Sequence, residues 1–205
     1  MSGETSRIEA FSDGVFSIAA TLLVLELKPP PANLPFWRGL AAQWPGFASF
    51  LLSFLFIGIM WINHHRLFTH VRRADDVLMV TNLLLLLGVV WIPYPTLLMA
   101  QALTSSRVSE AAILYNGSYL ALALLFNLQL QACIRGGLVD REYVALRHIA
   151  RNYAIGPVLY LICFAANWWS VPRSAWRSTP PWHCFSWCRL NCGGRNTTGN
   201  HKDLS

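Results

Sequence analysis

The sequence predicts an all-α protein, a polytopic membrane helix bundle with five clear spans and a doubtful sixth. Of the 205 residues, 54% are hydrophobic and only 13% are charged, whereas about one quarter of the residues in soluble domains carry a charge. The apolar residues come in separate blocks of about 20, and a helix of that length crosses the ~30 Å hydrocarbon layer of a bilayer. The stretch FSDG at 11–14 does not recur later in the chain, so an internally duplicated architecture is not expected.

The charged residues between the blocks predict the orientation. The formal net charge is +6, but the basic residues are scattered and form no stripe, which argues against a nucleic-acid partner. With a cytoplasmic N-terminus most of them lie inside, as the positive-inside rule requires. We therefore expect a multi-pass protein of the plasma membrane, surrounded by lipid. The inside set is Arg7, Arg66, Arg72, Arg73, Arg135, Arg141, Arg147 and Arg151, and the outside set is Lys28, Arg38 and Arg107.

The first two blocks are justified by their ends. Block one, 8–27, follows no basic n-region and precedes no cleavage site of small residues, so it is expected to remain as a span. It ends before three consecutive prolines, which cannot continue a helix, and the segment 28–43 is predicted to be a loop. Block two, 44–71, opens with Trp-Pro, a typical helix start, and closes with aromatic and basic residues suited to the membrane interface.

The later blocks are less uniform. Block three, 75–102, contains Pro93 and Pro95, which should kink or end its outer part. Block four, 111–134, is followed by the charged connector 135–151, and block five covers 152–169.

Beyond residue 169 the composition changes to a mixture of Pro, Trp, Arg, Cys and Asn without a sufficiently long apolar window. The sequence thus predicts a membrane unit at 1–169 and an atypical C-terminal segment at 170–205, either a degenerate sixth helix or a disordered tail. Within that segment, cysteines recur at every fourth position beside a histidine. Their spacing matches none of the common zinc-ligand patterns, so we expect no metal site and no cofactor. The residues are His183, Cys184, Cys188 and Cys192.

The first block opens with charged residues, which are costly near hydrocarbon unless they are paired, buried in protein or facing water. On a helical wheel, Ile18, Leu22 and Leu25 share a stripe about 60° wide, which Gly14 and Phe11 continue toward the N-terminus. Thr21 lies at its edge. Asp13 points about 140° away from Ile18, and Ser12 also points away from the stripe. An apolar row of this kind more often faces lipid or a neighbouring helix than a special surface.

The polar side of the first block requires partners from other helices. Block two leaves the membrane at the same side carrying His64 and His65, and Asn82 lies two turns into block three. Arg7 could complete a charge-paired network with Asp13. The hypothesis is a polar clamp that ties the first three helices together near the cytoplasmic interface.

The sequence R-x-x-x-F-S-D-G at Arg7, Phe11, Ser12, Asp13 and Gly14 resembles the signature of the transmembrane-protein-175 family of potassium channels. Further matches are Trp61, His64, His65, Asn82 and Pro93. The resemblance covers residues 5–169 and is to the prokaryotic branch, whose subunits each carry one six-helix unit and assemble as homotetramers.

The resemblance implies a pore formed by oligomerisation around the first helix of each subunit. Ile18 then falls on the narrowest hydrophobic constriction, Leu22 and Leu25 on further apolar layers, and Thr21 on a hydroxyl position implicated in selectivity. The sequence has no TVGYG-like filter segment, which fits such a channel. The implied function is a potassium-permeable cation channel with modest selectivity for potassium over sodium.

The resemblance also gives roles to the signature residues. Arg7, Ser12 and Asp13 are implied to form an interhelical network rather than a pore surface, and Gly14 to let a neighbour approach closely. The network is expected to include Phe11, Trp61, His64, His65 and Asn82 as structural members.

One alternative is a proton-coupled secondary transporter that uses Asp13, His64 and His65 as a relay. It predicts discontinuous helices and internal repeats, neither of which is visible. A di-histidine metal enzyme is disfavoured because adjacent histidines on a helix point about 100° apart. No arrangement of nucleophile and base, paired carboxylates or phosphate-binding glycines is recognisable, so no enzyme activity is expected.

Overall fold

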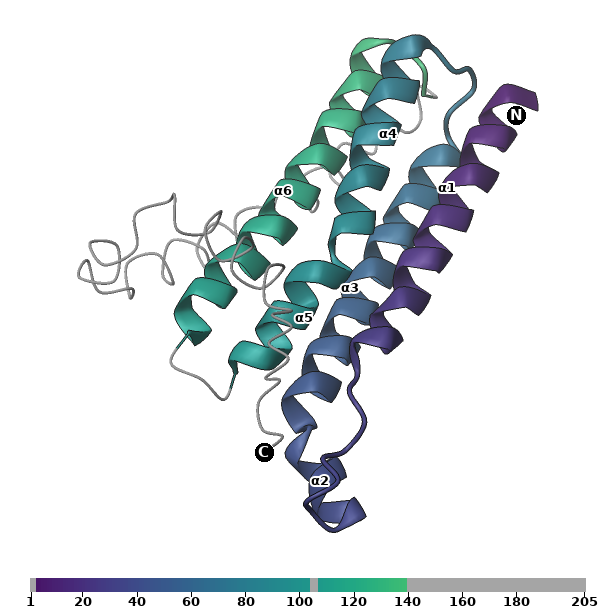
Figure 1. The fold of residues 1–205 in the computed structure, drawn as a ribbon. Coiled ribbons are helices and arrows are strands. Elements are labelled where there is room, and N and C mark those ends of the chain that lie inside the picture. The colour runs from purple at the N-terminus through teal and green to yellow at the C-terminus, as the bar shows by residue number, and fades with distance from the viewer. Residues whose placement is uncertain (1–2, 104–106, 140–205) are drawn as a thin grey trace, which may run out of the picture. The chain divides into compact units, whose positions relative to one another are not determined.

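The computed structural model describes residues 3–103 and 107–139, which all belong to one unit of the chain, 1–170. A second unit, 171–205, lies outside the described residues, as do the predicted fifth span, the doubtful sixth and the cysteine-rich segment. Four helical segments are long and apolar enough to cross a membrane, and Figure 1 shows them packed as a bundle. They are Thr5–Glu26, Trp44–Phe68, Asp76–Ala102 and Val108–Arg135. The all-helical class and the first four predicted spans are therefore confirmed.

The first span consists of the helix α1, Gly3–Leu22, continued by the short 3-10 helix η1, Leu23–Glu26. Leu27 is extended, with φ −76° and ψ 118°, and the prolines that follow cannot re-enter a helix. The segment 28–43 was predicted to be a loop, and this is wrong in one respect: it contains the helix α2, Phe36–Ala42. Pro35 is its N-cap, with φ −53° and ψ 136°, so the helix begins at the residue after the last proline.

The second span is α3, Trp44–Phe68, with Pro45 in its first turn. The third span starts as α4, Asp76–Trp91, and Asp75 caps it by accepting a 2.8 Å hydrogen bond from the backbone N–H of Leu78. The chain breaks at Ile92 and continues as α5, Pro93–Ala102. The kink predicted from the two prolines is therefore present, because neither can donate a helical hydrogen bond.

The fourth span is α6, Val108–Arg135, which packs along α4 and α5. Gly137 after it adopts φ +58°, a left-handed conformation that glycine tolerates best. The chain then returns against the α3–α4 connection, where the backbone N–H of Arg72 donates a 2.9 Å bond to the carbonyl of Leu138.

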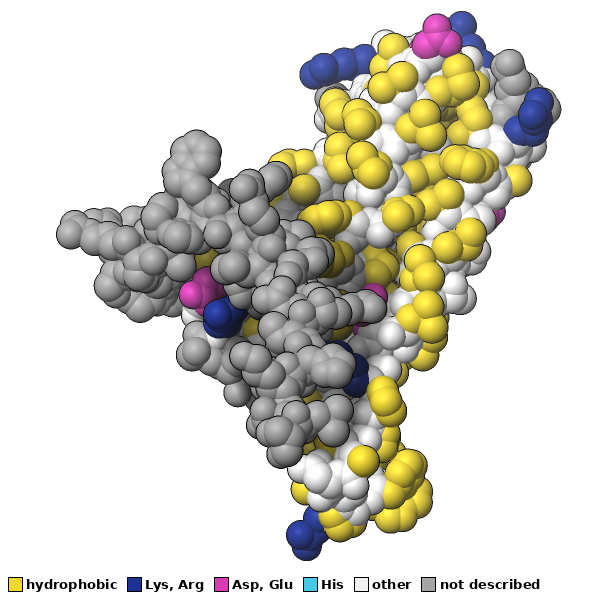
Figure 2. Space-filling model, viewed as in Figure 1, with side chains coloured by type: hydrophobic (Ala, Val, Ile, Leu, Met, Phe, Trp, Pro, Cys, Tyr) yellow, Lys and Arg dark blue, Asp and Glu magenta, His cyan; other side chains and the backbone are white. Residues whose placement is uncertain are grey.

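The interior of the bundle is mostly apolar. Figure 2 shows hydrophobic side chains covering much of the outer face as well, with charged side chains mostly toward its ends, as expected of a protein surrounded by lipid. Between α4 and α6 the helices approach closely at Gly88, where an added Cβ would lie 3.1 Å from both Leu122 and Leu125. The core residues on the four spans include Phe16, Leu23, Ile57, Leu67, Phe68, Leu78, Leu85, Val89, Leu122, Phe126 and Leu130.

Candidate ion-pathway helix and its polar supports

The first span, α1 continued by η1, has one buried face and one exposed face. Ser12, Phe16, Ala19 and Leu23 are buried against the bundle. The predicted apolar row lies on the other side: Ile18 is 58% exposed, Leu22 38% and Leu25 74%. Large aliphatic side chains on a membrane-spanning helix are thus left free to meet lipid or another subunit.

Asn82 of α4 is the centre of a buried hydrogen-bond network. Its Nδ2 donates to Ser12 Oγ at 3.0 Å, which joins α4 to α1. Its Oδ1 lies 2.9 Å from His64 Nε2 on α3, and because an amide oxygen only accepts, His64 must donate through Nε2. The network therefore ties the three helices together, with Ser12, His64 and Asn82 all at most 2% exposed.

A fourth helix joins the same network through a residue that the sequence analysis missed. Gln129 of α6 is fully buried and donates from Nε2 to Asn82 Oδ1 at 2.9 Å. The sequence does contain a signal that could have identified this residue: it is a glutamine inside an apolar span, and polar side chains within the membrane need partners.

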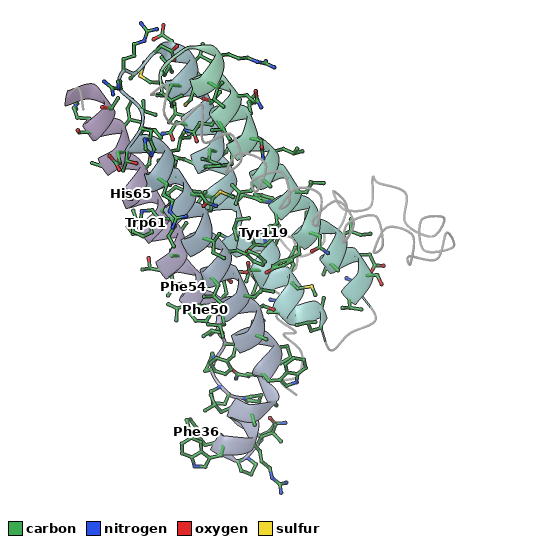
Figure 3. All side chains as sticks on the ribbon, turned by 180° about the vertical axis from the view of Figure 1, so that it is seen from behind. Phe36, Phe50, Phe54, Trp61, His65 and Tyr119 are labelled. Carbon is green, nitrogen blue, oxygen red and sulfur yellow. The ribbon has the colours of Figure 1, made fainter. Side chains whose placement is uncertain are left out.

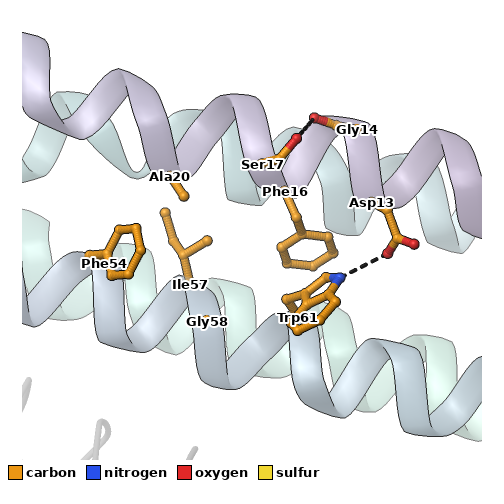
Figure 4. Close-up of a pocket in the computed structure, with 9 residues that line it drawn as sticks. All are labelled: Asp13, Gly14, Phe16, Ser17, Ala20, Phe54, Ile57, Gly58 and Trp61. Atoms are coloured by element: carbon orange, nitrogen blue, oxygen red, sulfur yellow. Dashed lines mark hydrogen bonds between the residues drawn. The ribbon is translucent and has the colours of Figure 1, made fainter.

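The signature aspartate makes its contact on a different side of α1. Figure 4 shows Asp13 accepting a 2.8 Å hydrogen bond from Trp61 Nε1 on α3. One turn earlier on α1, Glu9 pairs with His65 at 2.9 Å. The four-residue spacing of the two carboxylates matches that of the two partners on α3, so the helices are joined by two successive rungs. Figure 3 shows Trp61 and His65 near each other, and their rings stack at 5.9 Å.

The two sets of contacts fix the rotation of α1. Ser12 holds one side of the helix to α4, while Asp13 and Glu9 hold another side to α3. Ile18 points to neither partner helix and remains exposed.

Three signature residues have neighbours other than those predicted for the network. Arg7 and Phe11 line a cavity of about 560 Å³ between α1 and α4, together with Asp75 and Asp76. Asp13 is bonded to Trp61 instead, and the predicted Arg7–Asp13 pair is not formed between these two described residues. The physical reason is that Asp13 follows Arg7 by six positions, which places the two side chains about 120° apart around the helix.

Gly14 does not make the predicted close approach within the subunit. A Cβ added to it would meet no atom within 4 Å, and the same holds for Gly58 of α3. Both glycines line a cavity of about 510 Å³ beside Asp13 and Trp61, drawn in Figure 4.

The hydroxyl groups of the exposed face are bonded to their own helix. Thr21 donates to the carbonyl of Ile18 at 2.9 Å, and Ser17 donates to that of Gly14 at 2.8 Å. Since each hydroxyl hydrogen is used within the helix, the oxygen lone pairs remain available to an outside partner such as a cation.

A second buried polar cluster lies near the kink of the third span. Ser53 Oγ is 2.8 Å from Thr96 Oγ1 and 3.1 Å from the hydroxyl of Tyr115. Thr96 donates to the carbonyl of Ile92 at 2.8 Å, so Ser53 donates to Thr96 and Tyr115 donates to Ser53. These bonds connect α3, α5 and α6 where the prolines interrupt the backbone pairing.

The polar side chains described above hold the helices in position relative to one another. Among residues 3–103 and 107–139 no group of three His, Cys, Asp or Glu side chains could hold a metal ion. His64 and His65 have separate partners, Asn82 and Glu9.

Comparisons with known proteins show which family the chain resembles. The family described as endosomal/lysosomal potassium channel TMEM175 matches residues 7–93. A potassium channel of Chamaesiphon minutus is 44% identical over 177 residues, which cover 82% of this chain and 86% of that protein. A potassium channel of Streptomyces collinus is 50% identical over 127 residues, covering 60% and 62% of the two chains.

A solved structure and animal proteins are also similar. The crystal structure of a lysosomal potassium-selective channel TMEM175 homolog from Chamaesiphon minutus matches with a TM-score of 0.72 and 42% identity, covering 82% of this chain and 88% of that one. The endosomal/lysosomal proton channel TMEM175 of Mus musculus is 38% identical over 97 residues, covering 42% of this chain and 19% of the mouse protein. The chain belongs to the TMEM175 family, as shown by the signature at Arg7 to Gly14, the helical fold and the extent of these similarities.

Proposed function

We propose that the protein is a potassium-permeable cation channel of the plasma membrane, with its N-terminus in the cytoplasm. The observation that carries the proposal is the clamped rotation of α1, which leaves Ile18 and Leu22 exposed on a helix otherwise bonded to its neighbours. Family membership supports it, since two bacterial relatives are named potassium channels.

The ion pathway would run between the α1 helices of four subunits. Several observations support oligomerisation: the apolar row of α1 has no cover within the described residues, and Gly14 and Gly58 present open backbone surface. Small residues on membrane helices favour close packing with another helix. A homotetramer would bring four copies of Ile18 around one axis.

A ring of isoleucines would act as a hydrophobic constriction. An apolar ring narrower than a hydrated ion closes by losing its water, without a charged plug. Opening requires the ring to widen, and Leu22 and Leu25 would form further apolar layers along the pore.

Selectivity would arise from two sources. Potassium gives up its hydration shell at lower cost than sodium, so an apolar constriction favours potassium. Thr21 would add an oxygen ligand, since its hydroxyl hydrogen is bonded to the carbonyl of Ile18 and the oxygen lone pairs remain available. We expect the resulting preference to be modest.

The proton is a second candidate permeant ion, because the mouse relative is named a proton channel. The secondary-transporter alternative would use Asp13, His64 and His65 as a relay, but each of the three side chains is bonded to a different partner.

Single-channel recording tests the proposal. The full chain is reconstituted in planar bilayers, and reversal potentials are measured under potassium, sodium and proton gradients. We expect unitary currents with a reversal potential closest to that of potassium, and Ile18→Asn should lower the preference for potassium over sodium. Leu87→Asn on α4 is the matched control, since Leu87 is 68% exposed but lies on another helix. Slow pH-driven flux without unitary currents would favour the transporter, and equal effects of both variants would contradict the pore assignment.

A further inference from the structure

The helix α2 forms a small aromatic projection at one end of the bundle. It lies between the end of the first span and Trp44, the first residue of the second, and Figure 1 shows it beyond the ends of α1 and α3. Figure 3 shows Phe36 at this end, away from the labelled side chains of the bundle. Trp37 is 77% exposed and Phe36 59%.

The projection is held in a fixed shape by its own loop. Gly39 of α2 is buried, and an added Cβ would lie 3.0 Å from Cβ of Pro30. The backbone N–H of Gly39 donates to the carbonyl of Pro35 at 2.9 Å. Phe36 and Trp37 meet edge to face with ring centroids 5.1 Å apart. The exposed aromatic side chains of α2 therefore lie on a helix that packs against its own loop.

The charge of this segment has one sign. Lys28 and Arg38 are exposed, and the segment 27–43 contains no Asp or Glu, the nearest acidic residue along the chain being Glu26 at the end of η1. A short helix and its loop that combine exposed aromatic rings with exposed basic groups beside a membrane span suit the lipid headgroup layer, where amphipathic rings and cations both find partners.

We propose that α2 docks into the lipid interface of the leaflet at this end of the bundle. Phe36 and Trp37 enter the upper acyl-chain region, while Lys28 and Arg38 contact phosphates of anionic headgroups. Lipid is the occupant that matches both features, because the rings need an apolar phase and the cations need anions at the same depth. With the proposed cytoplasmic N-terminus, this leaflet is the outer one.

Tryptophan fluorescence of the full chain in vesicles tests the depth of α2. The emission of Trp37 is obtained as the difference between the parent protein and Trp37→Phe, which keeps an aromatic ring; Trp37→Tyr provides a second difference should the first variant fold poorly. We expect this component to be quenched strongly by lipids brominated near the headgroup, weakly by lipids brominated near the chain end, and little by aqueous iodide.

The charge requirement is tested in the same vesicles. Adding phosphatidylglycerol to phosphatidylcholine should shift the Trp37 component to shorter wavelength in the parent and in Arg38→Lys, but not in Arg38→Gln. Strong iodide quenching would place α2 in water, and resistance to both quenchers would place it against protein such as a second copy of the chain. Either result would overturn the proposal, whatever ions the channel conducts.

Discussion

Replacing Asn82 with leucine removes the centre of the buried network. Three hydrogen bonds are lost, from Asn82 to Ser12 and from His64 and Gln129 to Asn82. At about 0.6 kcal/mol per interhelical bond in membranes the loss is about 2 kcal/mol. Leaving the donors of His64 and Gln129 buried and unpaired adds to this, at about 1–3 kcal/mol per group in the general case. We expect Asn82→Leu to lower the free energy of unfolding by about 4 kcal/mol, from about 2 kcal/mol for the three bonds and about 1 kcal/mol, the low end of the range, for each of the two unpaired donors.

The assay is equilibrium unfolding of the purified protein by SDS in bicelles, followed by tryptophan fluorescence. Leu83→Ala is the control, because Leu83 is the next residue on α4 and is 56% exposed. Gln129→Leu should have a smaller effect than Asn82→Leu, since it leaves the bonds to Ser12 and His64 in place. The reasoning is refuted if Asn82→Leu unfolds within about 0.5 kcal/mol of the parent, the range of ordinary surface substitutions.

Three further changes separate anchoring, packing and selectivity. Asp13→Ala removes the bond to Trp61, so folded oligomer measured by size-exclusion chromatography should fall before the potassium preference changes, and the double variant with Trp61→Phe should lose no more than the larger single loss. A greater, additive loss would show that the pair does not interact. Gly88→Val should lower stability by about 1–3 kcal/mol in the SDS assay, because its side chain would meet Leu122 and Leu125; an unchanged midpoint would contradict the close approach of α4 and α6. Thr21→Ala should leave the SDS midpoint unchanged but lower the potassium preference in reversal-potential measurements, and an unaltered preference would remove Thr21 from the pathway.

Hydrophobic periodicity and composition were sufficient to predict the first four spans. Four spans follow from apolar blocks of membrane length, and the break at Ile92 follows from the prolines after it. The wheel also placed Ser12 and Asp13 away from Ile18, because angular position on one helix needs no knowledge of its neighbours. The short helix α2 was not predicted. Several prolines precede its seven residues and indicate a loop, and the helix depends on tertiary contacts such as that of Gly39 with Pro30.

Partners between helices were harder to predict than faces. The expected depth of each residue in the membrane was enough to predict that His64 and Asn82 lie near the first helix. It could not show that Trp61, rather than Arg7, is the partner of Asp13, because that depends on how α1 and α3 are rotated about their axes. Gln129 was missed because it is 47 residues from Asn82 in the chain, and no local pattern connects them.

The central claim is that the exposed row of α1 meets its copies around an axis through which ions pass. Silver ions applied to channels carrying Ile18→Cys test this most directly, since thiolates on a pore axis bind soft metal ions across the conduction path. Bilayer currents of Ile18→Cys should be blocked by silver, while the parent and Leu87→Cys should continue to conduct. Currents of Ile18→Cys that persist in silver would place this row outside the ion pathway and contradict the account.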